Sequence, residues 1–462
     1  MTAVKVMLTG SQGKLVGDIS PTVLVEISKM CSFRPEGIEF SDKVKNKEWD
    51  GVIHLFRNRH FPIGLLQRVV EYLVLCGIDF EVLDNRAIRS KKIELHSTYK
   101  MRDYQQVVVD DAIQAQRALI PVAVGGGKTI ISTEIIAKLG LKTLFICPTI
   151  EILEQTKKVL HEGLNMDIGL IHEKTFNPKH VTISTWQTIN SKLKKRENAQ
   201  PFLDYLASVD VLVWDEVHRL GADKLFEVSM HVNATYRYGL SGSLFRSDGQ
   251  ELKYYAGIGE AIKGLSASEL IDMGFLVPPK IRFINTPPMP FGWKDKWHDV
   301  YSQGVVNNFE RNKIIAEESK KLVEMGRTVL VMVSEVEHGK NLKALMDDAV
   351  FVDASSKDRR QIIDMYRQGH ISCLIATGII QEGFDMPEIT AIVVAAGGKS
   401  PILAVQRVGR GLRICPEIGK KDVIVIEFND VAKYLFDHSY ERYCLYKMER
   451  RFNIEGDIPG RL

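Results

Sequence analysis

Two sets of short, continuous apolar runs divide the middle and the end of this chain. In the first set, Thr143–Cys147 and Val209–Trp214 are each followed by polar or small residues and then by a segment with helical spacing. Apolar runs of about four to eight residues without alternation are typical of strands that are buried on both faces of a parallel sheet. Because such strands alternate with helices, the pattern predicts an α/β domain.

The second set repeats this alternation nearer the end of the chain. Its expected strands are Val329–Val333, Val350–Asp353, Cys373–Thr377, Ala391–Ala395 and Val423–Glu427. Between the two sets, residues 250–300 are less regular, and their paired prolines indicate a linker. The predicted fold class is α/β, with two parallel-sheet domains after a small N-terminal α+β unit. We expect domains at residues 1–95, 96–280 and 281–462.

The N-terminal unit has its own pattern of turns and short elements. Gly10–Gly13 separates two apolar runs and predicts a hairpin, and Pro21–Met30 has the spacing of a helix. Asp50-Gly51 predicts a tight turn between two strands. A helix over Leu65–Leu75 and a strand over Phe80–Leu83 complete the unit.

Three lysines alternate along one segment of this unit. If the segment is a strand, Lys43, Lys45 and Lys47 share one face, with Trp49 close by. Such a face is suited to holding a phosphate backbone. It is equally typical of a solvated strand whose lysines discourage pairing with another edge. Both interpretations stay open.

Composition and charge exclude several classes of protein. No apolar run reaches the ~20 residues of a membrane span, and no secretory signal opens the sequence, so we expect a cytoplasmic protein. The six cysteines are scattered without a Cys-x-x-Cys pair, which argues against disulfides and a zinc site. The formal net charge of +3 neither requires nor excludes nucleic acid.

A glycine-rich turn after an apolar run carries the first candidate chemistry. Gly125, Gly126 and Gly127 lead into Lys128 and Thr129 at the start of a helical pattern. Glycines let backbone N–H groups surround a phosphate, the lysine reaches the β- and γ-phosphates of ATP, and the threonine hydroxyl ligates Mg²⁺. The P-loop pattern begins with glycine, whereas Val122 stands here. The alternative is a structural glycine turn with an unrelated lysine.

Two adjacent carboxylates follow the strand predicted over Val209–Trp214. Beside a P-loop, Asp215 is expected to hold Mg²⁺, and Glu216 to orient and deprotonate the attacking water. The alternative is an acidic turn that caps a helix. The P-loop and the carboxylate pair together form the pattern of an ATP-hydrolysing site.

Other polar residues are less specific when taken alone. Gln105 lies one helix ahead of the P-loop, where it can read an adenine, although most glutamines are surface residues. Arg407, Arg410 and Arg413 are spaced by threes, so in one helix they lie along one side. They are candidates to stabilise phosphoryl charge, or they form a basic helix surface.

In this order, the motifs resemble those of superfamily 2 DNA helicases. The resemblance implies two RecA-like domains, ATP and Mg²⁺ as cofactors, and DNA as partner. It implies that Gln105 reads adenine and that Arg410 and Arg413 are catalytic with Lys128 and Glu216. The resemblance places Pro148, Thr149 and Thr185 in motifs that contact the nucleic-acid strand. It places Gly383 and Asp385 in a motif that takes part in nucleotide binding. Ser241-Gly242-Ser243 departs from the family's usual Thr-Ala-Thr or Ser-Ala-Thr.

Two further stretches resemble a narrower group, the XPB-like and UvsW-type phage helicases. Ser266–Pro279 is similar to the link between their two motor domains, and Phe33–Gly37 with Trp49–Gly51 resembles the UvsW-type accessory domain. This resemblance implies remodelling of branched DNA, by branch migration or fork regression, in recombination, repair or replication. It also implies that residues 1–95 bind DNA, with the lysines and Trp49 as candidates.

Three other functions stay open at this point. An RNA helicase is disfavoured by Asp-Glu-Val-His at residues 215–218 in place of Asp-Glu-Ala-Asp. A duplex translocase that does not separate strands is the second. A junction-binding protein with an inactive motor is the third, and Lys128, Asp215 and Glu216 argue against it.

Overall fold

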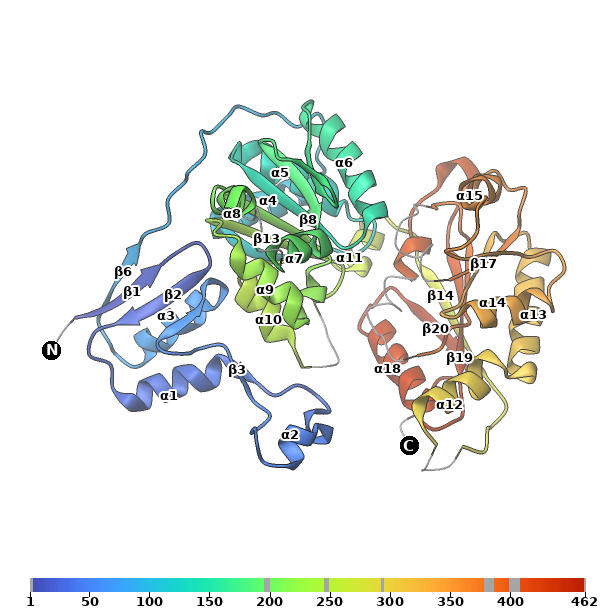
Figure 1. The fold of residues 1–462 in the computed structure, drawn as a ribbon. Helices are drawn as coiled ribbons and strands as arrows, with labels where there is room; N and C mark the ends of the chain where they lie inside the picture. The colour runs from blue at the N-terminus through green and yellow to red at the C-terminus, as the bar shows by residue number, and fades with distance from the viewer. Residues whose placement is uncertain are drawn as a thin grey trace. The chain divides into compact units, whose positions relative to one another are not determined.

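The computed structural model describes residues 3–194, 200–244, 249–291, 295–377, 386–398 and 408–460 (Figure 1). The chain forms two compact units, Met1–Val122 with Gly127–Gly264, and Ala123–Gly126 with Leu265–Leu462. The first unit contains an N-terminal module and a sheet domain, and the second contains another sheet domain. The expected boundaries at residues 95 and 280 remain predictions.

The N-terminal module is a four-stranded sheet of order β5-β2-β1-β6, with a separate two-stranded β3-β4 pair. The hairpin, the helix over Pro21–Met30 and the closing strand occur as predicted. Its elements are β1 (Val4–Leu8), β2 (Gln12–Val16), α1 (Pro21–Met30), β3 (Ser32–Phe33), η1 (Ile38–Phe40), α2 (Asp42–Lys45), β4 (Ile53–His54), β5 (His60–Pro62), η2 (Ile63–Leu65), α3 (Leu66–Leu75) and β6 (Phe80–Asp84).

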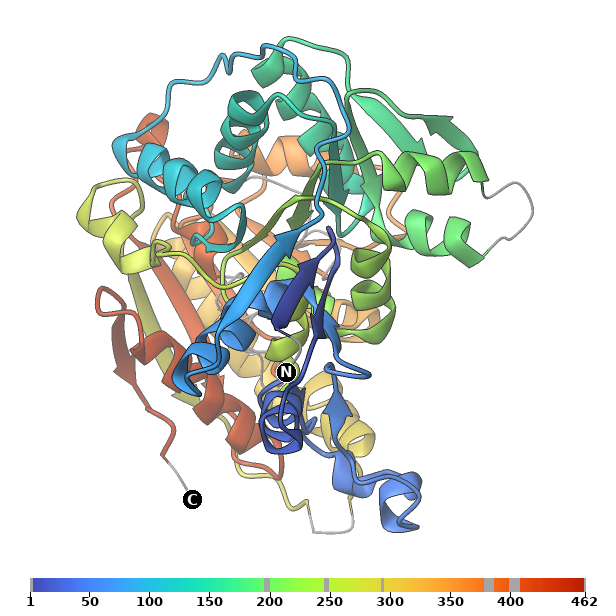
Figure 2. The same ribbon diagram turned by 90° about the vertical axis from the view of Figure 1, so that its left-hand side faces the viewer.

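Polar and close-packed contacts attach this module to the first sheet domain. The Arg68 guanidinium donates to both carboxylate oxygens of Glu260, at 2.6 and 3.2 Å. Gly64 lies so close to the backbone of Tyr255 that a Cβ at this position would overlap its carbonyl oxygen. After β6 the chain runs round the first sheet domain, where the Asp210 carboxylate accepts from the N–H groups of Arg89 and Ser90 (Figure 2).

The first sheet domain is a seven-stranded sheet of order β10-β9-β11-β8-β12-β13-β7, in which β10 alone is antiparallel among the described strands. All residues of the predicted strand Thr143–Cys147 are buried. The elements are α4 (Asp103–Ala115), β7 (Arg117–Pro121), α5 (Lys128–Leu139), β8 (Thr143–Cys147), α6 (Ile150–Leu164), β9 (Gly169–His172), β10 (Thr175–Asn177), β11 (Val181–Thr185), α7 (Trp186–Lys194), α8 (Gln200–Ala207), β12 (Val211–Asp215), η3 (Val217–Gly221), α9 (Asp223–His231), β13 (Tyr236–Ser241) and α10 (Glu251–Gly257).

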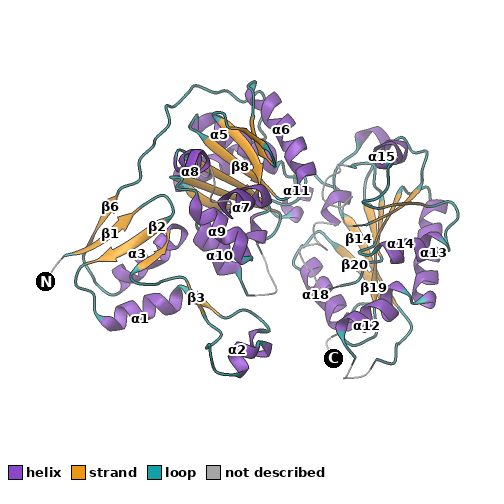
Figure 3. Cartoon of the chain, in the orientation of Figure 1, coloured by secondary structure: helices purple, strands orange, loops and turns teal. Residues whose placement is uncertain are grey.

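The second unit holds a seven-stranded parallel sheet of order β16-β17-β15-β18-β19-β14-β20, with helices on both faces (Figure 3). The five predicted strands occur here within two residues of their expected ends. The elements are α11 (Ala267–Asp272), β14 (Pro279–Asn285), α12 (Trp297–Tyr301), η4 (Ser302–Val306), α13 (Phe309–Glu324), β15 (Val329–Met332), α14 (Val336–Lys343), β16 (Val350–Val352), α15 (Arg359–Arg367), β17 (Cys373–Ala376), β18 (Ala391–Val394), η5 (Pro416–Ile418), β19 (Val423–Asn429), α18 (Leu435–Lys447) and β20 (Asn453–Gly456).

The interpretation of residues 250–300 as an irregular linker was incomplete. Strand β14 (Pro279–Asn285) lies between β19 and β20 inside the second sheet, and the chain after it forms α12. The sequence predicted a linker here because prolines stand at the first residue of the strand and just beyond its last. A proline at a strand's first residue is tolerated, since the sheet does not depend on its missing N–H.

Replacing Gly64 by alanine tests how the N-terminal module is held. The added methyl group would overlap the Tyr255 carbonyl, so we expect the free energy of unfolding to fall by ~1–3 kcal/mol, as for other overpacked sites. Hydrogen exchange in α3 should accelerate as the module loosens. Gly460→Ala is the control, because a Cβ there meets no other atom within 4 Å. Unchanged unfolding and exchange in Gly64→Ala would contradict this account.

Candidate ATP-hydrolysis site

The glycine-rich turn has the backbone shape that only glycine adopts readily. Gly125 and Gly127 have φ of +86° and +84°, in the left-handed region. The N–H of Gly126 donates to the carbonyl of Ala123 at 3.0 Å and tightens the turn. A Cβ on Gly127 would also collide with the side-chain amide of Gln105. The turn therefore depends on glycine for both conformation and space.

Gln105 is buried on α4 beside this turn. Its Oε1 accepts from the N–H of Arg102 at 3.0 Å, and its Nε2 faces Gly127. Both contacts fix the orientation of the amide. The structure thus brings Gln105 to the glycine turn, as the sequence suggested, and its reading of an adenine remains a prediction.

Lys128 and Glu216 meet across the end of the first sheet. Lys128 begins α5, and its Nζ donates to Glu216 Oε1 at 2.9 Å. Both side chains are largely buried. Thr129 follows Lys128 in the first turn of α5. The predicted phosphate-binding lysine and the predicted catalytic carboxylate are therefore neighbours in this fold.

The two adjacent carboxylates have different electrostatic surroundings. Burial, reinforced by the charge of Glu216, raises the pKa of Asp215 to about 6. Burial also acts to raise the pKa of Glu216, but the charges of Lys128 and His218 outweigh it and hold that pKa below its usual value. Of the two carboxylates, Asp215 is therefore the one more easily protonated, and a cation bound beside it would lower its pKa.

The backbone at Glu216 is strained in a way that is common at functional sites. This residue has φ of +50° and ψ of 51°, a left-handed conformation that costs a non-glycine residue ~1 kcal/mol or more. The N–H of Glu216 donates to Asp215 Oδ1 at 3.0 Å. The turn directs the Glu216 carboxylate toward Lys128.

A histidine extends this polar group to the next strand, which sequence reasoning did not foresee. His218 Nδ1 lies 3.3 Å from Glu216 Oε2 and 3.0 Å from Ser241 Oγ at the end of β13. The departure at Ser241-Gly242-Ser243 thus keeps the hydroxyl that contacts His218. The available signal was a histidine two residues after the carboxylate pair. Lys128, Glu216, His218 and Ser241 form what we call the site chain.

The predicted strand-contacting residues lie at the carboxyl ends of two neighbouring strands, β8 and β11. Thr149 Oγ1 caps α6 by accepting from the N–H of Ile152, and Gln187 Nε2 donates to the Pro148 carbonyl at 3.1 Å. Thr185 is buried, and its hydroxyl pairs with that of Thr188 at 2.9 Å. Nucleic-acid contacts by Pro148, Thr149 and Thr185 remain predictions.

Part of the predicted second-domain chemistry falls outside the described residues, namely Gly383, Asp385 and Arg407. Arg410 lies in a short helical stretch over residues 408–411. Arg413 comes after this stretch and forms an isolated backbone bridge with Leu276. The expectation that Arg413 lines a helix side was wrong, because the helix ends before it and the chain pairs with the residues that precede β14.

The three alternating lysines do not share a strand face. Lys43 and Lys45 are in the short helix α2, and Lys47 follows it with φ of +57°. Ser41-Asp42 provides a helix start, and no neighbouring strand pairs with this segment in the described structure. The predicted tight turn between two strands was wrong: Asp50-Gly51 forms a bend, in which Gly51 has φ of +80°, and it follows the α2 region rather than a strand.

The surroundings of these lysines also carry negative charge. The carboxylates of Glu39, Asp42 and Glu48 are exposed among them. Trp49 donates its Nε1–H to the Val52 carbonyl at 3.1 Å. DNA contacts by Lys43, Lys45, Lys47 and Trp49 remain predictions. The lysines do not form a continuous basic face, because acidic side chains lie among them.

Three protein families match successive parts of the chain. Residues 12–82 match "DNA helicase UvsW, N-terminal", residues 98–246 match "Type III restriction enzyme, res subunit", and residues 310–415 match "Helicase conserved C-terminal domain". The ATP-dependent DNA helicase uvsW of Enterobacteria phage T4 is 24% identical over 86% of this chain and 85% of its own length. These matches support an XPB/UvsW-like helicase of superfamily 2.

One further relative and one solved structure are similar to this chain, the solved structure in its fold alone. A protein of Halobacterium salinarum named after the Rad25 DNA 3'-5' helicases is 28% identical over 72% of this chain, which spans 56% of that protein's length. The solved structure of S. cerevisiae Dbp5 bound to RNA and ADP BeF3 has a TM-score of 0.52 and 16% identity, and covers 76% of this chain and 88% of its own. The predicted pair of RecA-like domains is confirmed.

The donor set near the site chain suits a magnesium ion. Asp215 and Thr129 offer a carboxylate and a hydroxyl, and Mg²⁺ prefers one or two such oxygen ligands together with phosphates and water. Among the described residues, no group of three or more His, Cys, Asp or Glu side chains forms a metal cage. In the same part of the helicase, no helix has the length and apolar character that a membrane crossing requires.

Lys128→Ala tests the centre of the helicase site. The change removes the cation that pairs with Glu216 and that is expected to hold the phosphates, so we expect ATP turnover to fall by ~10³-fold. Steady-state phosphate release measures it. Lys138→Ala is the control, because Lys138 lies on the same helix and pairs with the exposed Asp110. If Lys128→Ala hydrolysed ATP at the wild-type rate, the assignment of the ATP-hydrolysis site to these residues would be contradicted.

Proposed function

We propose that this helicase couples ATP·Mg²⁺ hydrolysis to the remodelling of branched DNA. The observation that carries the ATP-hydrolysing part is the 2.9 Å contact between Lys128 and Glu216 beside a turn built from glycines of positive φ. The UvsW-type N-terminal match over residues 12–82 supports branched DNA as the substrate.

The chemistry assigned to the first sheet domain follows from the site chain. Lys128 binds and neutralises the β- and γ-phosphates, and in doing so it leaves Glu216. The freed carboxylate, no longer paired with the lysine, accepts a proton from the attacking water. Asp215 and Thr129 hold Mg²⁺, which supplies positive charge for the phosphates. His218 and Ser241 pass the change at Glu216 to the end of β13.

The second sheet domain contributes the arginines. Arg410 and Arg413 stabilise the charge that develops on the transferred phosphoryl group, since a guanidinium is planar and permanently charged. Gly383 and Asp385 take part in nucleotide binding in this proposal. Because Arg413 follows a helix end and its backbone bridges Leu276, its position is tied to the link that precedes β14.

Branched DNA is favoured over two other substrates. A type I restriction motor or another duplex translocase would not require an N-terminal module of the UvsW kind. Dbp5, whose solved structure is bound to RNA, shares the fold, so it is the N-terminal match rather than the fold that favours DNA. We assign residues 1–95 as a DNA-binding accessory domain, followed by motor domains at 96–280 and 281–462.

Arg413→Ala separates nucleotide binding from hydrolysis. We expect ATP affinity to stay near that of wild type and turnover to fall by ~10²-fold or more, because the lost interaction forms mainly in the transition state. A fluorescent ATP analogue measures binding, and phosphate release measures turnover. Arg367→Ala is the control, because Arg367 is a half-buried arginine at the end of α15 that pairs with the exposed Asp364. Equal turnover by Arg413→Ala and wild type at saturating ATP would end its assigned role.

The substrate is tested with a synthetic four-way DNA junction and a tailed linear duplex, each incubated with the helicase and ATP. We expect the junction to be resolved faster than the duplex, and Lys128→Ala to resolve neither. Preference for the tailed duplex would contradict the branched-DNA proposal while leaving a helicase. ATP turnover that changes neither substrate would point to translocation without strand separation, and stimulation by RNA alone would replace DNA as substrate.

A further inference from the structure

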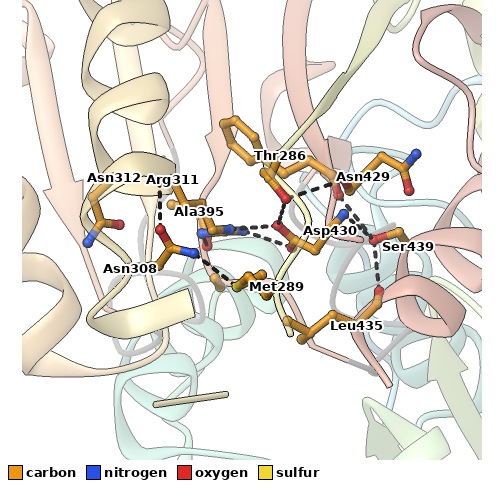
Figure 4. A network of polar contacts seen from close by, with 12 residues as sticks. Thr286, Met289, Asn308, Arg311, Asn312, Ala395, Asn429, Asp430, Leu435 and Ser439 are labelled. Carbon is orange, nitrogen blue, oxygen red and sulfur yellow. Dashed lines mark hydrogen bonds and ion pairs between the residues drawn. The ribbon is translucent and has the colours of Figure 1, made fainter. Parts of the chain in front are cut away.

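The start of α13 is fixed by a buried polar network in the second unit (Figure 4). Asn308 Oδ1 caps the helix by accepting from the N–H of Arg311 at 3.0 Å. The Arg311 guanidinium, which is fully buried, donates to both Asp430 carboxylate oxygens at 2.7 and 3.1 Å and to the Ala395 carbonyl at 2.8 Å. Asp430 also accepts from Thr286 Oγ1 at 3.1 Å.

This network joins segments that follow three neighbouring strands. Thr286 follows β14, Ala395 follows β18, and Asp430 follows β19. A bidentate arginine–carboxylate pair has well-defined geometry, so the first turn of α13 has little freedom to move relative to this edge of the sheet. We refer to the edge formed by the carboxyl ends of these parallel strands as the carboxyl edge.

Phe309 is presented to water from this fixed start. It lies between Asn308 and Arg311 in sequence, yet its side chain is 61% exposed. The other end of α13 leads directly into β15, so the helix runs back along the sheet and its two ends lie at opposite edges. Met325, which follows the last turn of α13 and is 64% exposed, therefore lies at the amino edge.

A second aromatic side chain is exposed at the carboxyl edge. Trp297 begins α12 and is 39% exposed, and its ring is supported by those of His438 and Tyr301, with centroids at 4.9 and 5.2 Å. The Tyr301 hydroxyl donates to the Ala396 carbonyl at 2.6 Å, which ties this cluster to the chain after β18. Phe309 and Trp297 are thus both held on segments anchored to the same edge.

The chemistry of this edge favours bases over phosphates. In parallel α/β sheets, ligands bind outside the carboxyl ends of the strands. The exposed carboxylates of Glu310 and Asp299 lie one residue after Phe309 and two residues after Trp297, whereas the exposed Lys296 directly precedes Trp297, so the charge beside the two rings is mixed and does not form a basic face for phosphates. An aromatic face, in contrast, stacks on any base, and this contact does not depend on charge.

We propose that Phe309 and Trp297 stack against the bases of a single DNA strand at the carboxyl edge of the second sheet. The inference rests on the proposed function, because it supplies a grip on DNA for that motor. The second sheet domain then contacts the bases of the strand. Because stacking is possible on any base and involves no phosphate, the contact should depend little on DNA sequence or on salt concentration.

The test measures binding of a fluorescein-labelled oligothymidylate by the full chain at several salt concentrations. We expect Phe309→Ala and Trp297→Ala each to raise Kd by about five-fold or more, the loss that removal of one stacked ring produces. The slope of log Kd against log salt should stay as in wild type, because no phosphate contact is removed. Met325→Ala, at the opposite end of the same helix, should bind as wild type does.

Conservative variants identify the ring as the cause. Trp297→Phe and Phe309→Tyr should restore most of the affinity, whereas Phe309→Leu, which keeps apolar volume without a ring, should not. Thermal unfolding of each variant checks that the fold is intact. Unchanged Kd in both alanine variants, a smaller salt slope, or equal loss in Met325→Ala would overturn the stacking proposal.

The outcome separates this inference from the proposed function. If wild type resolves junctions with ATP and the aromatic variants bind the strand as tightly as wild type, only the stacking contact fails. If the exposed rings instead dock a protein, DNA binding will not change, and the same result overturns the proposal. If wild type shows no DNA-dependent ATP turnover, the proposed function fails first.

Discussion

The ion pair between Lys128 and Glu216 is the interaction on which the rest of this structure depends. It places a cation and a carboxylate in a largely buried position at the end of a parallel sheet, where neither would be stable alone. The glycine turn, the strained backbone of Glu216 and the contact of His218 with Ser241 all serve to hold these two groups. In the proposed function, the pair separates when a phosphate of ATP binds Lys128.

The second sheet domain also contains buried pairs of opposite charge, which here hold loops in place. Two of its buried arginines pair with buried carboxylates, Arg311 with Asp430 and Arg442 with Glu427. Breaking such a pair is costly because a single charge remains buried. They fix the loops at the carboxyl ends of β18 and β19, and this rigidity is what a domain needs if it is to present arginines and DNA-contacting side chains at defined positions.

Much of the fold was predictable because its strands are continuous apolar runs, and the structure confirms β8 residue for residue and the five strands of the second set closely. The P-loop and the carboxylate pair were found because each combines rare residue types at fixed spacing. The failures have physical causes. Strand β14 begins with proline, the lysine segment at Lys43–Lys47 follows a helix start, and Arg413 comes after its helix has ended. The contact of His218 with Ser241 joins residues that are distant in sequence, and no local pattern encodes it.

The most direct test of the account is ATP turnover by Glu216→Gln, measured with and without four-way junction DNA. Glutamine keeps the size and the hydrogen-bonding oxygen of Glu216 but cannot accept the proton of the attacking water. The account predicts that ATP binding survives, that DNA stimulates wild type, and that turnover of the variant falls by ~10²-fold or more in both conditions. DNA-stimulated turnover in Glu216→Gln at the wild-type rate would contradict the account, because the catalytic base would then lie elsewhere.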